Sequence, residues 1–187
     1  MRAVRFHAYG PPAVLVVDDV PRPEPRAGEV LIRVQAAGVN PIDWKFRAGY
    51  LQQFVPLELP SIPGLDVAGT VEALGPGVAG LAPGQAVFGR GSGTYAMYAL
   101  APVTSLARKP EGVSFEEAAT IAVGGVSAWV GLFDRPMCSR GNGSWSRVRL
   151  AAWARMPSSS PSGRARRWPA RPRMPISTLC ALSVLMR

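Results

Sequence analysis

Hydrophobic and polar positions alternate over short stretches in the first part of the chain, and Gly and Pro interrupt them, a pattern that predicts short β-strands. Residues 29–39 place Val30, Ile32 and Val34 on one side, which indicates a strand with one face more buried than the other. Further strands are expected in residues 1–7, 14–17, 65–74, 75–89 and 94–110, the last range holding two. Many short strands at close spacing predict a mainly β fold, a strongly bent and partly open barrel.

Two stretches follow a helical pattern instead. Residues 42–50 predict a short helix that opens with the sequence NPID and closes at Gly49. Ser114 and Glu117 have the spacing of a capping box, so a second helix is expected to begin there. The Gly124-Gly125 pair is expected to break or bend that helix.

Charge divides the chain into two unequal parts. Of the 21 Lys and Arg residues and 12 acidic residues, residues 1–134 hold 10 and 12, a net charge of −2. Residues 135–187 hold the other 11 basic residues, all Arg, and no acid. The basic character therefore belongs to residues 135–187 alone.

Cysteine and hydropathy exclude several classes of protein. Cys138 and Cys180 both lie beyond residue 134, so residues 1–134 can form neither a disulfide nor a thiolate metal site. No apolar run approaches the roughly 20 residues that span a membrane, so no membrane partner is expected. The first ten residues, MRAVRFHAYG, lack the apolar region of a secretory signal. The expected location is the cytoplasm.

Six segments of residues 1–134 together resemble one known family. In order they are MRAVRFHAYGPP; PRPEPRAGEVLIRVQAAGVNPIDWKFRAGY; PGLDVAGTVEALGPGV; PGQAVFG; GTYAMYAL; and SFEEAATIAVGGVSAWVGLFD. Their order and spacing are similar to those of the zinc-independent medium-chain dehydrogenases/reductases of the quinone oxidoreductase (zeta-crystallin-like) type. The resemblance implies that residues 1–134 form a GroES-like N-terminal domain, which covers the active-site cleft and includes the start of the interdomain helix.

The resemblance also implies an activity. Family members reduce quinones or activated alkene carbonyls by hydride transfer from NADPH, which a following Rossmann domain binds. The choice between quinone and enone, and between NADPH and NADH, stays open. Family members often form homodimers through the Rossmann domain, for which residues 135–187 show no pattern, so the oligomeric state of this chain stays open.

The resemblance places Asn40, Asp43, Trp44 and Lys45 in the segment that faces the cleft. Asn40 is expected to bind the nicotinamide amide, the ribose or a substrate carbonyl; its alternative role is to cap the following helix. Lys45 stands where relatives have a cofactor-contacting tyrosine, and it retains a hydrogen-bond donor. Thr120 and Gly124 are expected beside the cofactor at the domain junction; the alternative is a packed helix.

Asp43 and Trp44 are the candidate substrate-pocket residues, and no catalytic residue is assigned. Asp43 has an alternative role, in which its charge favours the start of the helix. Trp44 has an alternative role in core or interface packing.

The same segments argue against zinc. Zinc-dependent relatives have a cysteine where this chain has Val39-Asn40-Pro41 and a His-Glu pair where it has Leu65-Asp66. The chain has a single histidine, His7. Since tetrahedral zinc needs several converging Cys, His or carboxylate ligands, no metal is expected.

Residues 135–187 depart from the family pattern. They contain 11 Arg and three Trp, no Lys, Asp, Glu, Gln, Phe, Tyr or His, and no Rossmann glycine fingerprint. Back-translated with GC-rich codons and read from the last base of codon 136, residues 137–154 become DVQPGQRVLVAGAAGGVG. Residues 174–187 become DADFHSVRALGADE. The first holds the A-x-G-x-x-G turn of a dinucleotide-binding domain.

We therefore expect a frameshift near residue 135 in a gene for a longer reductase. As written, residues 135–187 are predicted to be disordered and the chain to be truncated and inactive, because the Rossmann domain is lost. The alternative function is a non-catalytic barrel whose Arg-rich tail binds nucleic acid through phosphate contacts and base stacking. The family-like pattern in the second frame disfavours that partner.

Overall fold

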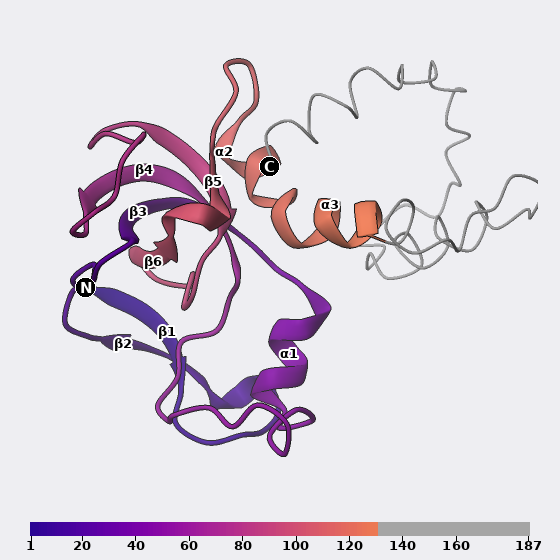
Figure 1. Cartoon of the computed structure of the whole chain (residues 1–187). Helices are drawn as coiled ribbons and strands as arrows, with labels where there is room; N and C mark the ends of the chain where they lie inside the picture. The colour runs from indigo at the N-terminus through magenta and orange to yellow at the C-terminus, as the bar shows by residue number, and fades with distance from the viewer. Residues whose placement is uncertain (131–187) are drawn as a thin grey trace, which may run out of the picture.

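The computed structural model describes residues 1–130, and the predictions for residues 131–187 lie outside the described residues. Within residues 1–130, seven strands and three α-helices are joined by loops, of which the connection over residues 48–65 is the longest (Figure 1). The strands are β1 (Arg2–Phe6), β2 (Leu15–Asp19), β3 (Glu29–Gly38), β4 (Asp66–Leu74), β5 (Ala86–Arg90), β6 (Tyr98–Pro102) and β7 (Leu106–Arg108). The helices are α1 (Pro41–Arg47), α2 (Phe115–Ala119) and α3 (Ala122–Trp129), with short 3₁₀ turns at Pro12–Val14 and Val103–Ser105.

The strands form two antiparallel sheets. Five strands lie in the order β6-β3-β4-β5-β7, and β1 pairs with β2 in a separate hairpin. Isolated bridges, Ala3 with Ala96 and Phe6 with Ser61, join the hairpin to the rest of the domain. The barrel is therefore open, which confirms the mainly β, GroES-like fold with a partly open barrel.

The core lies inside the five-stranded sheet and under α2. One cluster of buried apolar side chains comes from β3, β4, β5 and β6: Val30, Ile32, Val67, Val71, Val87 and Ala101. A second cluster joins the sheet to α2 through Ala68, Phe88, Ala118 and Ala119. The β3–β4 pairing shifts register between Leu31 and Ile32 and again between Val34 and Ala36. Such irregularities bend strands, which lets the sheet curve around this core.

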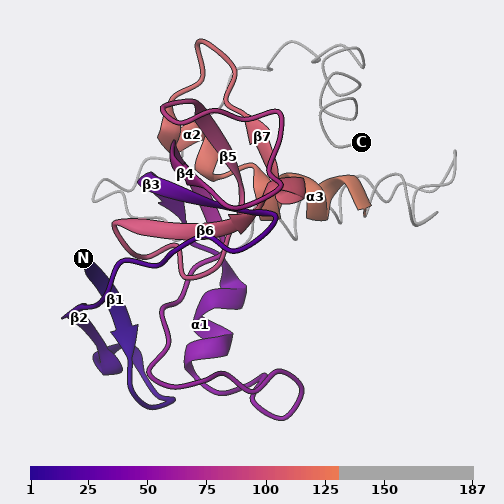
Figure 2. The ribbon, with the colours of Figure 1, turned by 60° about the vertical axis from the view of Figure 1, so that its left-hand side comes forward.

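In both ribbon views, α1 and the β1–β2 hairpin lie at one end of the five-stranded sheet, and α2 and α3 lie at its other side (Figures 1 and 2). The first helix is shifted from its predicted position, since it spans Pro41–Arg47 rather than 42–50. Gly49 has φ = +84°, a conformation that few residues other than glycine adopt, and it stops the helix as expected.

The predicted break at Gly124-Gly125 is wrong. Both glycines lie inside α3, and the chain turns at Thr120–Ile121 instead. Two interactions explain the difference. The Thr120 N–H and hydroxyl both donate to the Glu117 carbonyl oxygen, at 3.1 and 2.8 Å, and tighten the end of α2. The N–H of Val123 donates to the Asp66 carboxylate rather than to a preceding helical carbonyl.

Candidate functional site

Three segments that are distant in sequence meet at one place: the stretch from the end of β3 to the start of α1, the start of β4, and the turn between α2 and α3. Gly38 and Asp66 are opposite each other in the β3–β4 pairing. A Cβ on Gly38 would collide with the Ala119 carbonyl oxygen and lie 2.8 Å from the Asp66 Cβ. Glycine at position 38 therefore lets the α2–α3 turn approach the two strands.

Asp66 connects the starts of two helices. Its Oδ2 accepts a hydrogen bond from Nδ2 of Asn40 at 2.8 Å, and its Oδ1 accepts one from the Val123 N–H at 2.9 Å. The side chain is almost fully buried, with 1% of its surface exposed. Because buried carboxylates are stable only when hydrogen-bonded, both oxygens need these partners.

Asp43 makes a second set of bonds at the start of α1. Its Oδ2 accepts from the Asn40 N–H at 2.8 Å and from the Tyr95 hydroxyl at 2.9 Å. The Asn40 side chain faces the Asp43 N–H in a capping-box arrangement, while that N–H donates to the Asn40 main-chain oxygen at 3.0 Å. We call Asn40, Asp43, Asp66 and Tyr95 the polar cluster.

Burial dominates the electrostatics of the polar cluster. Desolvation raises the pKa of Asp43 against the lowering effect of the hydrogen bonds from Asn40 and Tyr95. Burial likewise raises the pKa of Asp66, and the nearby Asp43 charge adds to the shift. The pKa of Tyr95 is also raised, by burial first and by its bond to Asp43 second. The Oδ1 of Asp43 is buried without a hydrogen-bond partner among the described residues.

The structure places the predicted cofactor residues in two groups. Asn40 belongs to the polar cluster, and Thr120 and Gly124 flank Val123 at the α2–α3 turn that Asp66 holds. A Cβ on Gly124 would have no atom of residues 1–130 within 4 Å, so the described part of the chain leaves this face of α3 uncovered. Lys45 lies further along α1, half-buried, and its carbonyl oxygen accepts the Tyr50 N–H at 3.0 Å.

The two predicted substrate residues have different surroundings. Asp43 is buried, and its contacts with Asn40 and Tyr95 favour the alternative role at the helix start over direct contact with a substrate. Trp44 is 46% exposed, and its ring meets the Tyr50 ring edge-on at a centroid distance of 5.5 Å. Trp44 is therefore not a core residue in this domain.

Sequence reasoning missed Asp66 and Tyr95 as members of the cluster. Asp66 begins a strand of otherwise apolar residues, and a charged residue in such a position is a signal that a specific partner is present. Tyr95 lies 52 residues from Asp43, in a stretch predicted as part of a strand that precedes β6 in the structure, and no local pattern indicates their contact.

The described residues contain no group of three or more His, Cys, Asp and Glu side chains that could hold a metal ion. The histidine, His7, is exposed and lies 2.7 Å from the Asp18 carboxylate. Likewise, no helix within residues 1–130 combines the length and apolar character of a membrane span.

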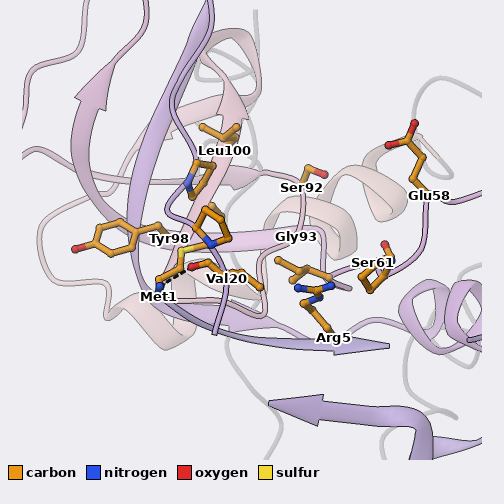
Figure 3. A pocket seen from close by; sticks show the side chains of 14 residues that line it. Met1, Arg5, Val20, Glu58, Ser61, Ser92, Gly93, Tyr98 and Leu100 are labelled. Carbon is orange, nitrogen blue, oxygen red and sulfur yellow. Dashed lines mark hydrogen bonds between the residues drawn. The ribbon is translucent and has the colours of Figure 1, made fainter. Parts of the chain in front are cut away.

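A separate hollow of about 500 Å³ lies between β1, the connector after β2, and β6 (Figure 3). Arg5, Glu58, Ser61 and Tyr98 contribute to its lining, which includes no member of the polar cluster. Arg5 pairs with Asp18 at 3.5 Å, and the N-terminal ammonium of Met1 donates to the Val20 oxygen at 2.6 Å. Both cationic groups of the hollow are thus engaged within the chain.

Comparison with known proteins gives one consistent result. Residues 26–111 match the alcohol dehydrogenase GroES-like domain. The chain is 43% identical over 126 residues to the quinone oxidoreductase of Lama guanicoe, covering 66% of this chain and 38% of that protein. It is 35% identical over 133 residues to the chloroplast envelope quinone oxidoreductase homolog of Arabidopsis thaliana, covering 68% and 40%.

Solved structures agree with these relatives. A mycobacterial protein solved in complex with NADPH matches with a TM-score of 0.70 and 39% identity, over 75% of this chain and 43% of that one. Escherichia coli quinone oxidoreductase, also solved with NADPH, matches with a TM-score of 0.65 and 29% identity, over 71% and 40%. The chain therefore spans about 40% of the length of the curated relatives named above.

Proposed function

Because residues 1–130 belong to the quinone oxidoreductase family, as its GroES-like N-terminal domain, we propose that they form the substrate-side domain of an NADPH-dependent oxidoreductase. The proposed reaction is hydride transfer to a quinone or an activated alkene carbonyl. The observation that carries the proposal is the coincidence of the polar cluster with an open helix face. Asn40 and Gly124 come from different segments. Asn40 donates to Asp66, and Gly124 follows Val123, whose N–H also donates to Asp66.

NADPH supplies the hydride when it is bound, and the residues of this domain bind and orient the reacting groups. Asn40 offers a polar side chain, Lys45 a cation, and Gly124 a surface that a flat ring can approach closely. Thr120 contributes less, since its hydroxyl already donates to the Glu117 carbonyl. Trp44, with its neighbour Tyr50, offers an apolar wall for an aromatic or conjugated substrate.

We also propose that the reaction is independent of zinc. Asn40 and Asp66 stand at the positions where zinc-dependent relatives carry metal ligands, and they bond to each other at 2.8 Å. The Asp66 carboxylate also accepts from the Val123 N–H, and an amide such as that of Asn40 is not among the Cys, His and carboxylate ligands of zinc. The substrate carbonyl is then oriented by hydrogen bonds rather than by a zinc ion acting as a Lewis acid. The cytoplasmic location stays a prediction.

The first test is to resequence the gene across codons 130–190 from source DNA. A single-base error near codon 135 would identify a longer reductase and explain the composition of residues 135–187. If resequencing gives the same codons, a sequencing error is excluded and the gene encodes residues 135–187 as written.

The second test compares two proteins: the 187-residue chain and the product of a gene whose frame is shifted at codon 136. We expect NADPH oxidation with quinones or enones from the frame-shifted gene and none from the 187-residue chain, because the latter shows no dinucleotide-binding pattern after residue 134. Turnover by the 187-residue chain would refute its proposed inactivity. A folded product that reduces neither substrate class would refute the proposed function.

A further inference from the structure

Asp66 has no part in the proposed reaction, yet each of its two carboxylate oxygens accepts a hydrogen bond from a different segment of the chain. It reaches Asn40, 26 residues earlier, and Val123, 57 residues later. Both contacts are short, and the side chain is almost wholly removed from solvent. Asp66 thus connects Asn40, the N-cap residue of α1, to the first turn of α3, the two places where cofactor contacts are expected.

The bond to Asp66 fixes the orientation of the Asn40 carboxamide. An ionised carboxylate only accepts hydrogen bonds, so it must face the nitrogen of the amide and not its oxygen. The amide cannot flip without placing its oxygen against the Asp66 Oδ2. The other side of the Asn40 side chain faces the N–H of Asp43 at the start of α1. The carboxamide is therefore constrained from two directions.

This orientation determines what Asn40 offers to a ligand. The Nδ2 group has two hydrogens, and one of them is used by Asp66 at 2.8 Å. The second has no partner among residues 1–130, and Asn40 is only half-buried. What remains is an N–H donor, which matches a carbonyl oxygen rather than an N–H or O–H group.

We propose that Asp66 is a positioning residue that orients the Asn40 amide so that its remaining N–H binds a carbonyl oxygen. That oxygen belongs either to the nicotinamide carboxamide or to the quinone or enone substrate. The inference rests on the proposed function, because it takes Asn40 to face the cleft. The inference specifies that Asn40 donates the hydrogen bond to the ligand, and that Asp66 sets the orientation of the Asn40 amide.

The orientation itself is tested first, in the full 187-residue chain by NMR without ligand. In the wild type, one Asn40 Nδ2 proton should exchange with solvent about tenfold more slowly than the other, since it is bonded to a buried carboxylate. Asp66→Asn keeps an oxygen for Val123 but presents a second donor to Asn40. We expect the slow Asn40 proton to be lost while the Val123 amide stays protected. Equal exchange of the two protons in the wild type, or no change in Asp66→Asn, would overturn the proposal.

A double variant separates positioning from folding. Asn40→Asp with Asp66→Asn exchanges donor and acceptor, so the introduced amide donates to the introduced carboxylate. The introduced amide also accepts from Val123, and a carboxylate is as good an N-cap as an amide. We expect the double variant, like Asp66→Asn, to keep the wild-type protection of Val123 to within about threefold, which shows that the α2–α3 turn is still folded. It nevertheless has no N–H to offer a ligand from position 40.

Ligand binding is then measured by amide shifts of Thr120 and Val123 in the same chain. One arm uses reduced nicotinamide mononucleotide; the other uses duroquinone, a fully methylated quinone that does not add thiols. We expect one probe to shift the wild-type signals, which identifies the source of the carbonyl. The double variant should bind that probe about tenfold more weakly, the loss expected when a buried acceptor loses its donor.

The binding results test the proposed function and the role of the Asn40 N–H separately. If neither probe shifts the wild-type signals, the proposed function of this face is refuted, whatever the exchange rates of Asn40. If a probe binds the wild type and the double variant equally, the Asn40 N–H is not its donor and the present inference is refuted. The proposed function would survive that second result.

Discussion

Two helices of this domain begin with the same local motif in different surroundings. At α1, the N–H of Asn40 donates to the Asp43 carboxylate at 2.8 Å; at α2, the N–H of Ser114 donates to the Glu117 carboxylate at 2.9 Å. Ser114 and Glu117 are exposed, and their bonds to each other complete the motif. Asp43 is buried and also accepts from Tyr95.

The difference shows how burial changes the role of a capping box. On the surface, the motif satisfies the free N–H groups of one helix and does little else. In the interior, the same motif needs further donors, and those donors come from distant parts of the chain. The α1 box therefore joins the loop at Tyr95 through Asp43, and it joins β4 and α3 through the bond from Asn40 to Asp66.

The largest expected effect comes from removing the third-position carboxylate of each box. Asp43→Ala leaves the Asn40 N–H and the Tyr95 hydroxyl without their acceptor, and we expect a loss of about 2 kcal/mol in the free energy of unfolding. Glu117→Ala removes an exposed bond and should cost about 0.5 kcal/mol. Urea unfolding followed by circular dichroism measures both. Equal losses would show that burial does not distinguish the boxes.

The separation of local from distant contacts also explains what the sequence could predict. Alternation along residues 29–39 was enough to predict β3, because a strand with one buried face shows its period in the residues themselves. The α2 box was predictable for the same reason, since Ser114 and Glu117 lie within one helical turn. The order of the strands in the sheet was not predicted, because it depends on pairings between segments that are distant in sequence.

The site was less predictable because its bonds are long-range. Asn40 and Asp43 were found, but their partners Asp66 and Tyr95 were not, since no local pattern brings those segments together. The misplaced helix break has the same origin. Glycine favours a bend locally, but the Asp66 carboxylate takes the Val123 N–H and moves the break to Thr120–Ile121.

Tyr95→Phe isolates the contact that the α2 box does not have. The ring is retained and one hydroxyl is lost, so Asp43 keeps only the Asn40 N–H as a donor to Oδ2. We expect a loss of about 1 kcal/mol in the free energy of unfolding. The matched control is Tyr98→Phe, because the contact of the Tyr98 ring with Arg22 does not use the hydroxyl. A loss as large in Tyr98→Phe would mean that the effect is not specific to Asp43.

The third prediction concerns α3, whose first turn is bonded by Asp66 and not by a box of its own. Gly124→Ala adds a methyl group where no atom of residues 1–130 lies within 4 Å, and alanine favours a helix over glycine. We expect the 187-residue chain to gain about 0.5 to 1 kcal/mol in thermal or urea unfolding. In the product of the frame-shifted gene, the same methyl should raise the KM for NADPH if Gly124 lies against the cofactor.

Gly38→Ala is the control for this gain. Its added methyl would collide with the Ala119 carbonyl and crowd the Asp66 Cβ, so it should destabilise the chain. A gain at both positions would contradict the close approach at β3. A stabilised Gly124→Ala chain with an unchanged KM in the frame-shifted protein would remove Gly124 from the cofactor site.

The smallest expected effect is a pH dependence that belongs to the buried box. Burial raises the pKa of Asp43, so the folded state holds a proton at pH values where the unfolded carboxyl, with a pKa of about 3.9, has lost it. Between those two pKa values the folded state binds more protons than the unfolded state, and stability falls as pH rises. The wild type should therefore gain stability relative to Asp43→Asn as pH falls from neutral toward about 4.

Urea unfolding of the wild type and Asp43→Asn over this pH range gives the difference, because asparagine does not titrate. Glu117→Gln, measured in parallel, supplies the baseline for a carboxylate in the same motif at the surface. Should the wild type instead lose stability relative to Asp43→Asn as pH falls, the hydrogen bonds from Asn40 and Tyr95 would outweigh burial. Asp43 would then be a carboxylate held in its charged form, and its burial would not set it apart from the exposed box at α2.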